Sequence, residues 1–218
     1  MQQRSGIFGA PPSHHKSADL IGVFGSSKAS GGAATILNTL FTEATSGNVT
    51  GTSPATNVHG NLWVTWPTVA SLTYQVGGGA KASLATGSGN IIDTGATAYT
   101  VTFSGMTNTN GVVITFSMSS ASATDRMELW TLGSGGIALK ETVANTTSQL
   151  QTQPVANGAT GSVVAVVNGT SITVTAFGQA PMTYTIPNGH ADIGGRFVGL
   201  INTIAGAYTF GGVKVTIP

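Results

Sequence analysis

The sequence predicts an all-β fold, an antiparallel two-sheet jelly-roll sandwich that follows an extended N-terminal arm. Two observations predict the sandwich. From about Leu62 onward, apolar residues alternate with Thr, Ser and Gly over short segments, which is the period-two pattern of half-buried strands. About ten such segments follow one another at roughly 10-residue spacing, with no long helical pattern between them. A third observation, the weak patterning of residues 1–50, predicts the arm.

Residues 1–50 are therefore predicted to be an arm and linker, and residues 51–218 the sandwich domain. Pro11-Pro12 interrupts regular structure, and the Ser, Gly and Ala run at Ser26–Ala34 is typical of a linker. Isolated apolar clusters fit two alternatives: an arm that lies across a neighbouring subunit, or an extension that adds one strand to its own sheet. The candidate arm anchors are Leu20, Ile21, Val23 and Phe24.

The alternation also predicts which side chains of each strand share a face, because successive side chains of a strand point to opposite faces. The sets that share a face are Tyr99, Val101 and Phe103; Val112, Ile114, Phe116 and Met118; Met127, Leu129 and Thr131; and Ile137, Leu139 and Val143.

Two turns are predicted from glycine. Val163–Val167 and Ile172–Phe177 flank Asn168-Gly169-Thr170, where an Asn-Gly step suits the positive φ angles of a tight hairpin. Near the end of the chain, the apolar positions change from even to odd numbers across Gly211-Gly212. We expect a β-bulge there to restore the register.

Composition limits the possible partners. Only 7% of the 218 residues are charged, the net charge is +1, and no basic stripe runs along the chain, so a nucleic-acid partner is not expected. Cysteine is absent, which excludes disulfides and thiolate metal sites. No apolar stretch reaches the length of a signal peptide or of a transmembrane span, so we expect no membrane contact and assembly in a host cytoplasm.

Two passages carry a family resemblance. The first comprises Gly51-Thr52-Ser53-Pro54, Gly60-Asn61-Leu62-Trp63 and the Gly-rich segment 76–82; the second comprises 195–200 and 208–215. They resemble the opening and closing of concanavalin-like (laminin-G-like) jelly rolls, a fold found in lectins, some glycosidases and bacteriophage virion structural proteins. The resemblance implies a jelly roll over most of the chain, and by itself implies no single function.

The acidic residues argue against catalysis. They are Asp19, Glu43, Asp93, Asp125, Glu128, Glu141 and Asp192, and none stands in the Glu-x-Asp-x-Glu strand of glycosidases with this fold. Only Asp125 and Glu128 are close in sequence, and a spacing of three puts them on opposite faces of a strand. The chain is predicted not to be an enzyme, with no catalytic residues and no cofactor.

One pair of residues has the side-chain types of metal ligands. His190 and Asp192 would share a face of an extended segment, as metal ligands or as an acid–base pair. The Pro187-Asn188-Gly189 turn just before them, and the lack of a third ligand nearby in the sequence, favour an exposed loop histidine instead. No metal site is predicted.

The tryptophans are the candidate contact residues. Trp63 and Trp66 fall on opposite faces of one strand, and Trp130 is out of phase with Met127 and Leu129, so we expect an outward ring at Trp130. Trp63, Trp66 and Trp130 are therefore predicted to lie at a subunit interface, in the core, or in contact with a glycan.

Together these features favour a non-catalytic structural component of a bacteriophage virion, of the capsid-decoration, collar or tail-fibre type. In this hypothesis the arm anchors the chain, the jelly roll is exposed, and the partners are copies of the chain in a homo-oligomer and other virion proteins. The alternative hypothesis is a lectin-like carbohydrate-binding module that recognises host surface glycans.

Overall fold

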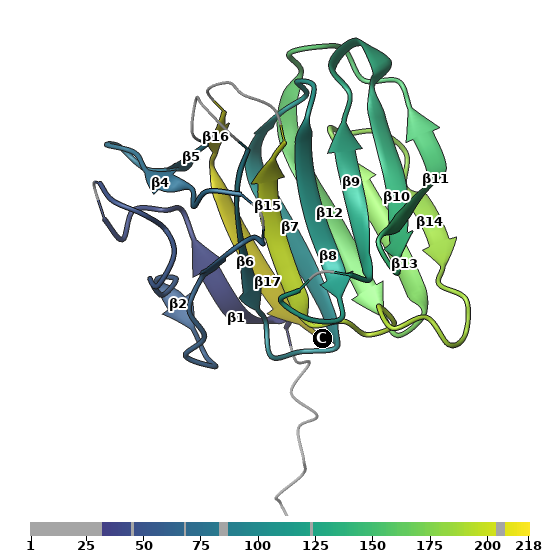
Figure 1. Ribbon diagram of the computed structural model, residues 1–218, viewed down its shortest axis with the longest axis horizontal. Helices are drawn as coiled ribbons and strands as arrows, with labels where there is room; N and C mark the ends of the chain where they lie inside the picture. The colour runs from purple at the N-terminus through teal and green to yellow at the C-terminus, as the bar shows by residue number, and fades with distance from the viewer. Residues whose placement is uncertain (1–31, 45, 68, 83–86, 123, 204–207) are drawn as a thin grey trace, which may run out of the picture. The chain divides into compact units, whose positions relative to one another are not determined.

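The protein is an antiparallel β-sandwich. The structure, a computed structural model, describes residues 32–44, 46–67, 69–82, 87–122, 124–203 and 208–218. These residues form two seven-stranded sheets and one three-stranded sheet (Figure 1). The predicted arm anchors Leu20, Ile21, Val23 and Phe24 lie outside the described residues. No helix in the described part of the chain has the length and apolar character needed to cross a membrane.

The strands follow one another in space in a fixed order. The first sheet, called the β14–β2 sheet, runs β14 (Met182–Thr185), β13 (Ser171–Ala176), β12 (Thr160–Asn168), β7 (Ala98–Thr107), β17 (Gly212–Ile217), β1 (Ala34–Thr39) and β2 (Thr56–Asn57). The second, called the β11–β3 sheet, runs β11 (Thr146–Gln153), β10 (Ile137–Val143), β9 (Arg126–Thr131), β8 (Val112–Met118), β15 (Phe197–Asn202), β6 (Ser88–Asp93) and β3 (Val64–Thr65). The small sheet consists of β16 (Thr209–Phe210), β5 (Ala80–Lys81) and β4 (Thr73–Tyr74).

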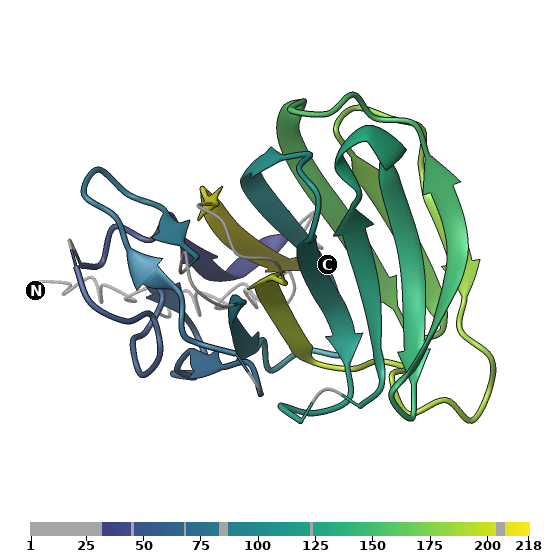
Figure 2. The same cartoon turned by 45° about the horizontal axis from the view of Figure 1, so that its top comes forward.

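The two large sheets form separate layers, and the small sheet lies on the side away from β11 and β14 (Figures 1 and 2). One turn of 3₁₀ helix, Gly133–Gly135, joins β9 to β10. Between the layers lies the main core, which contains most of the residues that the alternation predicts to share a face, such as Tyr99, Val101 and Phe103 of β7. Burial of these apolar side chains is the main stabilising contribution.

Met118 is an exception to the predicted faces. The alternation predicts that it shares a face with Ile114 and Phe116, but it belongs to a second apolar cluster. The positive φ of Ser117 and the register shift there interrupt the alternation.

The sandwich begins before residue 50, which corrects the predicted domain boundary. The compact unit starts at Gly32. Strand β1 pairs with β17 on one side and β2 on the other, and Phe41 and Val49 are completely buried in the core. The segment that looked like linker thus contributes a strand, because its short apolar clusters can pair with the sheet even though the residues around them are Ser, Gly and Ala.

Of the two turns predicted from glycine, the structure confirms one and contradicts the other. The hairpin is confirmed: Asn168 pairs with Ser171 across a two-residue loop, and Gly169 has a φ of 58°. The expected bulge at Gly211-Gly212 is wrong. Phe210 pairs with Ala80 in the small sheet, whereas Gly212 pairs with Ser104 of the β14–β2 sheet. The inward-facing residues change from even to odd positions because the chain passes from the small sheet to the β14–β2 sheet at this point.

Side chains of edge strand β11 reach across the open side of the sandwich. The Gln151 amide donates a 2.6 Å hydrogen bond to the backbone carbonyl of Thr183 in β14, and the Gln153 amide donates a 2.7 Å bond to the carbonyl of Ala180. β11 and β14 are the edge strands of their sheets. These two bonds therefore tie the sheets together along one side.

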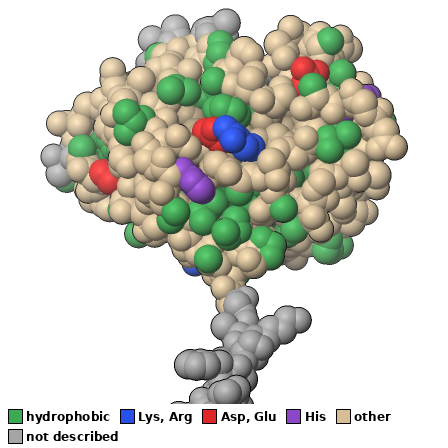
Figure 3. All heavy atoms as spheres, turned by 90° about the horizontal axis from the view of Figure 1, so that it is seen from below, with side chains coloured by type: hydrophobic (Ala, Val, Ile, Leu, Met, Phe, Trp, Pro, Cys, Tyr) green, Lys and Arg blue, Asp and Glu red, His purple; other side chains and the backbone are tan. Residues whose placement is uncertain are grey.

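The surface agrees with the low charge content. Figure 3 shows one face on which neutral polar groups and backbone dominate, apolar side chains form small patches, and charged side chains are few. One of the ion pairs joins the exposed Arg196 to the mostly buried carboxylate of Asp93 at 2.5 Å. Such a surface pair contributes little to stability, about 0–1 kcal/mol.

Candidate functional site

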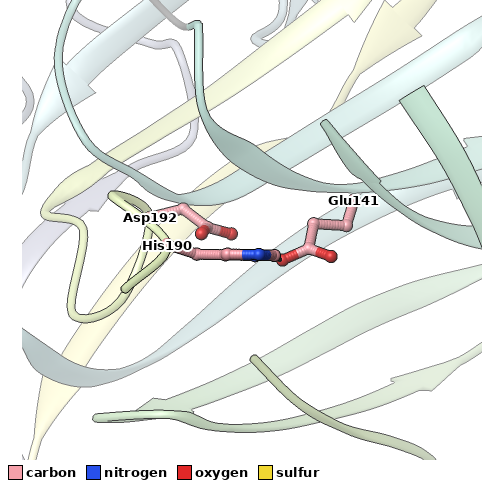
Figure 4. A group of neighbouring side chains, drawn as sticks. All are labelled: Glu141, His190 and Asp192. Carbon is pink, nitrogen blue, oxygen red and sulfur yellow. Dashed lines mark hydrogen bonds and ion pairs between the residues drawn. The ribbon is translucent and has the colours of Figure 1, made fainter. Parts of the chain in front are cut away.

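One group of ionisable side chains is brought together by strand β10 and the loop between β14 and β15. Glu141 comes from β10, while His190 and Asp192 come from the loop that joins β14 to β15. One ligand atom from each side chain lies within 4.8 Å of the corresponding atoms of the others. In Figure 4 the carboxylate of Asp192 and the imidazole of His190 both point toward Glu141. We call these three residues the carboxylate–imidazole cluster.

Backbone contacts fix the loop that carries two members of the cluster. The Ser117 hydroxyl donates a 2.5 Å hydrogen bond to the Asp192 carbonyl, and the Tyr99 hydroxyl donates to the Gly195 carbonyl at 3.2 Å. The Ser117 N–H in turn donates to the Tyr99 oxygen at 2.9 Å. Ser117 has a φ of 49°, unusual for a residue other than glycine, and this strained conformation places its polar groups against the loop.

Glu141 uses both of its oxygens. Its Oε1 lies 2.8 Å from Nδ1 of His190, and its Oε2 accepts a 2.8 Å hydrogen bond from the Tyr184 hydroxyl of β14. The hydrogen bond to Glu141 raises the pKa of His190. Burial, together with this hydrogen bond, raises the pKa of Tyr184 to about 12. The cluster therefore joins β10, β14 and the loop in one polar network.

Asp192 is the least satisfied member of the cluster. It is completely buried, and neither carboxylate oxygen has a hydrogen-bond partner among the described residues. Burial, and next the negative charge of Glu141, raise its pKa to about 6. An unpaired buried carboxylate is costly, because removal from water disfavours the charged form.

Sequence spacing alone does not reveal Glu141. No third ligand lies near His190 and Asp192 in the sequence, and the fold brings in Glu141 from about fifty positions earlier in the chain. A signal was present: Glu141 stands between Leu139 and Val143, two residues of a predicted inward-facing set. The alternation implied a buried acid at this position, and burial of Glu141 is observed.

A second polar group lies on the outward face of the β11–β3 sheet and centres on Glu128. Glu128 is only 1% exposed, and both of its oxygens are engaged. Oε1 accepts from Arg126 Nε at 2.5 Å, while Oε2 accepts from Trp130 Nε1 at 2.9 Å and from the Thr142 hydroxyl at 3.3 Å. A carboxylate held by a guanidinium and an indole is suited to positioning its neighbours and poorly suited to proton transfer.

Cationic side chains lie over two indole rings on this face. Lys140 Nζ lies 4.1 Å from the centroid of the half-buried Trp130 ring, and Arg126 Cζ lies 5.1 Å from the centroid of Trp66. Exposed polar side chains of β11 adjoin them: Gln149 pairs with Lys140, and Thr147 pairs with Thr142, their hydroxyls being 2.7 Å apart. We call Trp66, Arg126, Trp130, Lys140, Thr147 and Gln149 the indole face.

The three predicted contact tryptophans have different surroundings. Trp63 is 1% exposed and packs against Phe41 in the main core, with ring centroids 5.7 Å apart, so it is not available as an outside contact. Trp66 and Trp130 belong to the apolar cluster on the outward face. Trp66 is 9% exposed and Trp130 is half-buried, so of the three rings Trp130 is the most accessible.

The remaining features offer less chemistry. A shallow groove of about 300 Å³ lies beside the small sheet, lined by Leu40, Thr42, the 77–79 turn, Thr209 and Gly211, with no charged or aromatic side chain. Among the described acids, Glu141 and Asp192 do come close together. They lie inside the sandwich, however, and Asp192 is completely buried, so a sugar ring could not lie between them without a rearrangement.

Comparisons with known proteins support the fold. No protein-family model matches the sequence, and the search of curated proteins gave no match. Among solved structures, the β-glucanase of Bacillus licheniformis is similar with a TM-score of 0.51 and 12% identity, over 81% of this chain and 100% of that chain. The carbohydrate-binding module CBM66 from Bacillus subtilis has a TM-score of 0.42 and 7% identity, over 71% of this chain and 90% of that chain.

The domain therefore has the fold of a jelly-roll sandwich, similar to that of the β-glucanase and consistent with the resemblance to concanavalin-like jelly rolls. Nothing in the comparisons links it to virus particles. The predicted virion role, with copies of the chain and other virion proteins as partners, remains a prediction.

Proposed function

We propose that this protein is a carbohydrate-binding module and that the indole face holds the glycan. The observation that carries the proposal is Trp130, a half-buried indole on the outward face of the β11–β3 sheet whose ring is covered by the side chain of Lys140. The fold is shared with a β-glucanase, whose name gives a polysaccharide as its substrate, and this likeness is a fold-level analogy.

Trp130 offers a flat apolar surface for the apolar side of a sugar ring. A lysine over an exposed indole contributes only about 0.5–1 kcal/mol, so displacement of the Lys140 head group costs little. The aliphatic stem of Lys140 can then lie along the face while its ammonium meets ligand oxygens. The ring itself does not need to move, because the Trp130 N–H is fixed to Glu128 at 2.9 Å.

Hydrogen-bonding groups lie on the same face as this ring. Lys140 covers the ring and pairs with Gln149 of β11. Thr147 lies farther along β11, opposite Thr142. Lys140 is a donor, the amide of Gln149 both donates and accepts, and the hydroxyl of Thr147 does the same. Gln149 and Thr147 are exposed. A pyranose presents an apolar face with hydroxyls around its rim, so the Trp130 ring with Lys140 beside it suits one sugar. Gln149 and Thr147 could bind further sugars of a chain along β11.

Binding rather than hydrolysis is favoured by the state of Glu128. Glycoside hydrolysis needs a second carboxyl group within about 5–10 Å across the bond and one group that can transfer a proton. Glu128 has both oxygens occupied by Arg126, Trp130 and Thr142. Its role in this proposal is to position Arg126 and Trp130.

The test is a glycan array probed with the full chain and with Trp130→Ala, followed by calorimetric titration of the best glycan. We expect binding that falls at least tenfold in Trp130→Ala. The control is Val166→Ala, a change in an exposed apolar residue on β12 of the other sheet, and this variant should bind as the unmodified chain does. A chain that binds no glycan, or a Trp130→Ala variant of unchanged affinity, would overturn the proposal.

Lys140 gives a second test of the same face. Lys140→Ala uncovers the Trp130 ring and removes one donor and one positive charge. We expect weaker binding of a glycan that carries carboxylates, because the lost charge pairs with them, and unchanged or tighter binding of a neutral one. Equal loss for both kinds of glycan would contradict the stacking arrangement.

A further inference from the structure

We propose that Glu141, His190 and Asp192 bind one divalent transition-metal ion, with Zn²⁺ as the representative of the class. The site is independent of the indole face and of any glycan. It rests on the geometry of three donor side chains and on the unpartnered, completely buried carboxylate of Asp192.

The donors already converge. Glu141 Oε1 and His190 Nδ1 are 2.8 Å apart, and a ligand atom of Asp192 lies within 4.8 Å of both side chains. Metal–ligand bonds of about 2.0–2.2 Å in a tetrahedral site put neighbouring donors about 3.4 Å apart. The hydrogen-bonded pair would need to open by roughly half an ångström, which rotation of the half-exposed His190 ring can supply.

Asp192 supplies the second, independent observation. Both of its oxygens are buried and neither accepts a hydrogen bond from another described residue, although the neighbouring carboxylate of Glu141 opposes a second negative charge. Buried carboxylates are normally paired or coordinated to a metal. A dication between Asp192 and Glu141 would compensate both charges at once.

The donor set decides the class of ion. One imidazole nitrogen with two carboxylates suits Zn²⁺ and its neighbours, whereas Ca²⁺ and Mg²⁺ prefer sites made of oxygen alone. Two carboxylates and a neutral imidazole carry a charge of −2, equal and opposite to that of the ion. Asp125 adds a further negative charge nearby.

Neighbouring groups already orient the ligands. The Tyr184 hydroxyl holds Glu141 Oε2 at 2.8 Å, which directs Oε1 toward His190. The Ser117 hydroxyl holds the Asp192 backbone. Such supporting hydrogen bonds are characteristic of metal sites, where they fix the orientation of the ligands. Three protein ligands leave a fourth position for water or for a group from outside.

The test is a titration of the full chain with Co²⁺ and with Zn²⁺, followed by visible absorption and by calorimetry. Because His14 and His15 could bind these ions themselves, the chain also carries His14→Gln and His15→Gln. We expect one equivalent of Co²⁺ to give the visible bands of a low-symmetry site, Zn²⁺ to displace it, and both ions to raise the midpoint of thermal unfolding. A hundredfold excess of Ca²⁺ should displace neither.

Asp192→Asn is the decisive variant. It keeps the shape of the side chain and removes an unpaired buried charge, so the variant should fold at least as well without metal. Its affinity for Zn²⁺ should fall at least tenfold. The matched control is Asp93→Asn, the same change in a carboxylate outside the cluster, which should bind Zn²⁺ as the unmodified chain does.

Three results would overturn the proposal: Zn²⁺ binding that disappears when His14 and His15 are replaced, Asp192→Asn that binds as tightly as the control, or Ca²⁺ bound more tightly than Zn²⁺. If Asp192→Asn is unexpectedly unfolded, His190→Gln serves instead, because it removes the nitrogen ligand from a half-exposed position. Unchanged Zn²⁺ affinity in that variant would equally reject the site. None of these outcomes bears on glycan binding.

Discussion

The Tyr184 hydroxyl donates a 2.8 Å hydrogen bond to Oε2 of Glu141 and so connects an edge strand of one sheet with the second strand of the other. Tyr184→Phe removes this bond and leaves a buried carboxylate oxygen without its partner. We expect a loss of about 1–3 kcal/mol in the free energy of unfolding, measured by urea denaturation.

Tyr74→Phe is the matched control for that change. Tyr74 is buried, whereas Tyr184 is partly buried, and the Tyr74 hydroxyl lies 2.7 Å from the neutral hydroxyl of Thr52. The loss there should be smaller, about 0.5–1.5 kcal/mol. Equal losses in the two variants would show that the charge of Glu141 adds nothing to the bond.

Gly195 should not tolerate a side chain. A Cβ at this position would lie 2.5 Å from backbone atoms of Ser117 and Met118, which cannot move away as a side chain can. We expect Gly195→Ala to cost at least about 2 kcal/mol and to displace the loop that carries His190 and Asp192. Thermal unfolding and hydrogen exchange of the loop measure the two effects.

Gly32→Ala is the corresponding control, because a Cβ there meets nothing within 4 Å and no positive φ is required. Its unfolding midpoint should be unchanged. A Gly195→Ala variant as stable as Gly32→Ala would mean that the loop does not pack closely on β8.

The buried Tyr208 should make the free energy of unfolding depend on pH in the alkaline range. The residue is buried, and its hydroxyl oxygen accepts a 2.6 Å hydrogen bond from the Thr107 N–H. Burial raises its pKa to about 12 from an ordinary value of about 10. Because the pKa is higher in the folded chain, the stabilisation is complete below pH 10 and is lost as the pH rises from about 10 to about 12.

The loss from this single group should be of the order of 2–3 kcal/mol. Tyr208→Phe has no ionisable group at the position, so its stability should fall less across the same interval. The measurement is denaturant unfolding of both chains from pH 9 to pH 12. Parallel curves would contradict the prediction.

Truncation separates the sandwich from the N-terminal residues. A chain that starts at Gly32 should unfold cooperatively, because every described strand is retained. A chain that starts at Gly51 lacks β1, which pairs with β17 and β2, and also lacks the buried Phe41. We expect it to be unfolded by circular dichroism, and a native spectrum would contradict the placement of β1.

The chain that starts at Gly32 also tests the predicted arm. Light scattering compares the mass in solution of the full chain with that of residues 32–218. An assembly device in the first 31 residues predicts that only the full chain associates, as the virion hypothesis requires. Equal monomeric masses would reject association through the arm.

Much of the fold follows from local patterns in the sequence. Alternation identified the inward faces of β7, of β9 and of β8 as far as Phe116, and the Asn168-Gly169 step identified the β12–β13 hairpin. The strand at Ala34–Thr39 was ambiguous, because its pairing with β17 joins opposite ends of the chain. Likewise, the parity change at Gly211-Gly212 reports a change of sheet, which a local pattern cannot distinguish from a bulge.

The sites were predicted less completely, for the same physical reason. His190 and Asp192 were singled out as neighbours in sequence, but Glu141 reaches them only through the approach of two sheets. The outward direction of Trp130 followed from phase, whereas the contacts of Glu128 with Arg126 and Thr142 depend on side-chain positions within and across strands. Contacts between distant segments require the tertiary fold, and local spacing does not specify them.

The glutamine bonds between β11 and β14 also bear on how copies of this protein could associate. Unpaired carbonyls along an edge strand are a template on which another chain can add a strand, a route to uncontrolled aggregation. At Thr183 the carbonyl is already taken by Gln151, and at Ala180 by Gln153. One carbonyl of β14 and one just before it are thus occupied, which makes strand addition at these two positions less favourable.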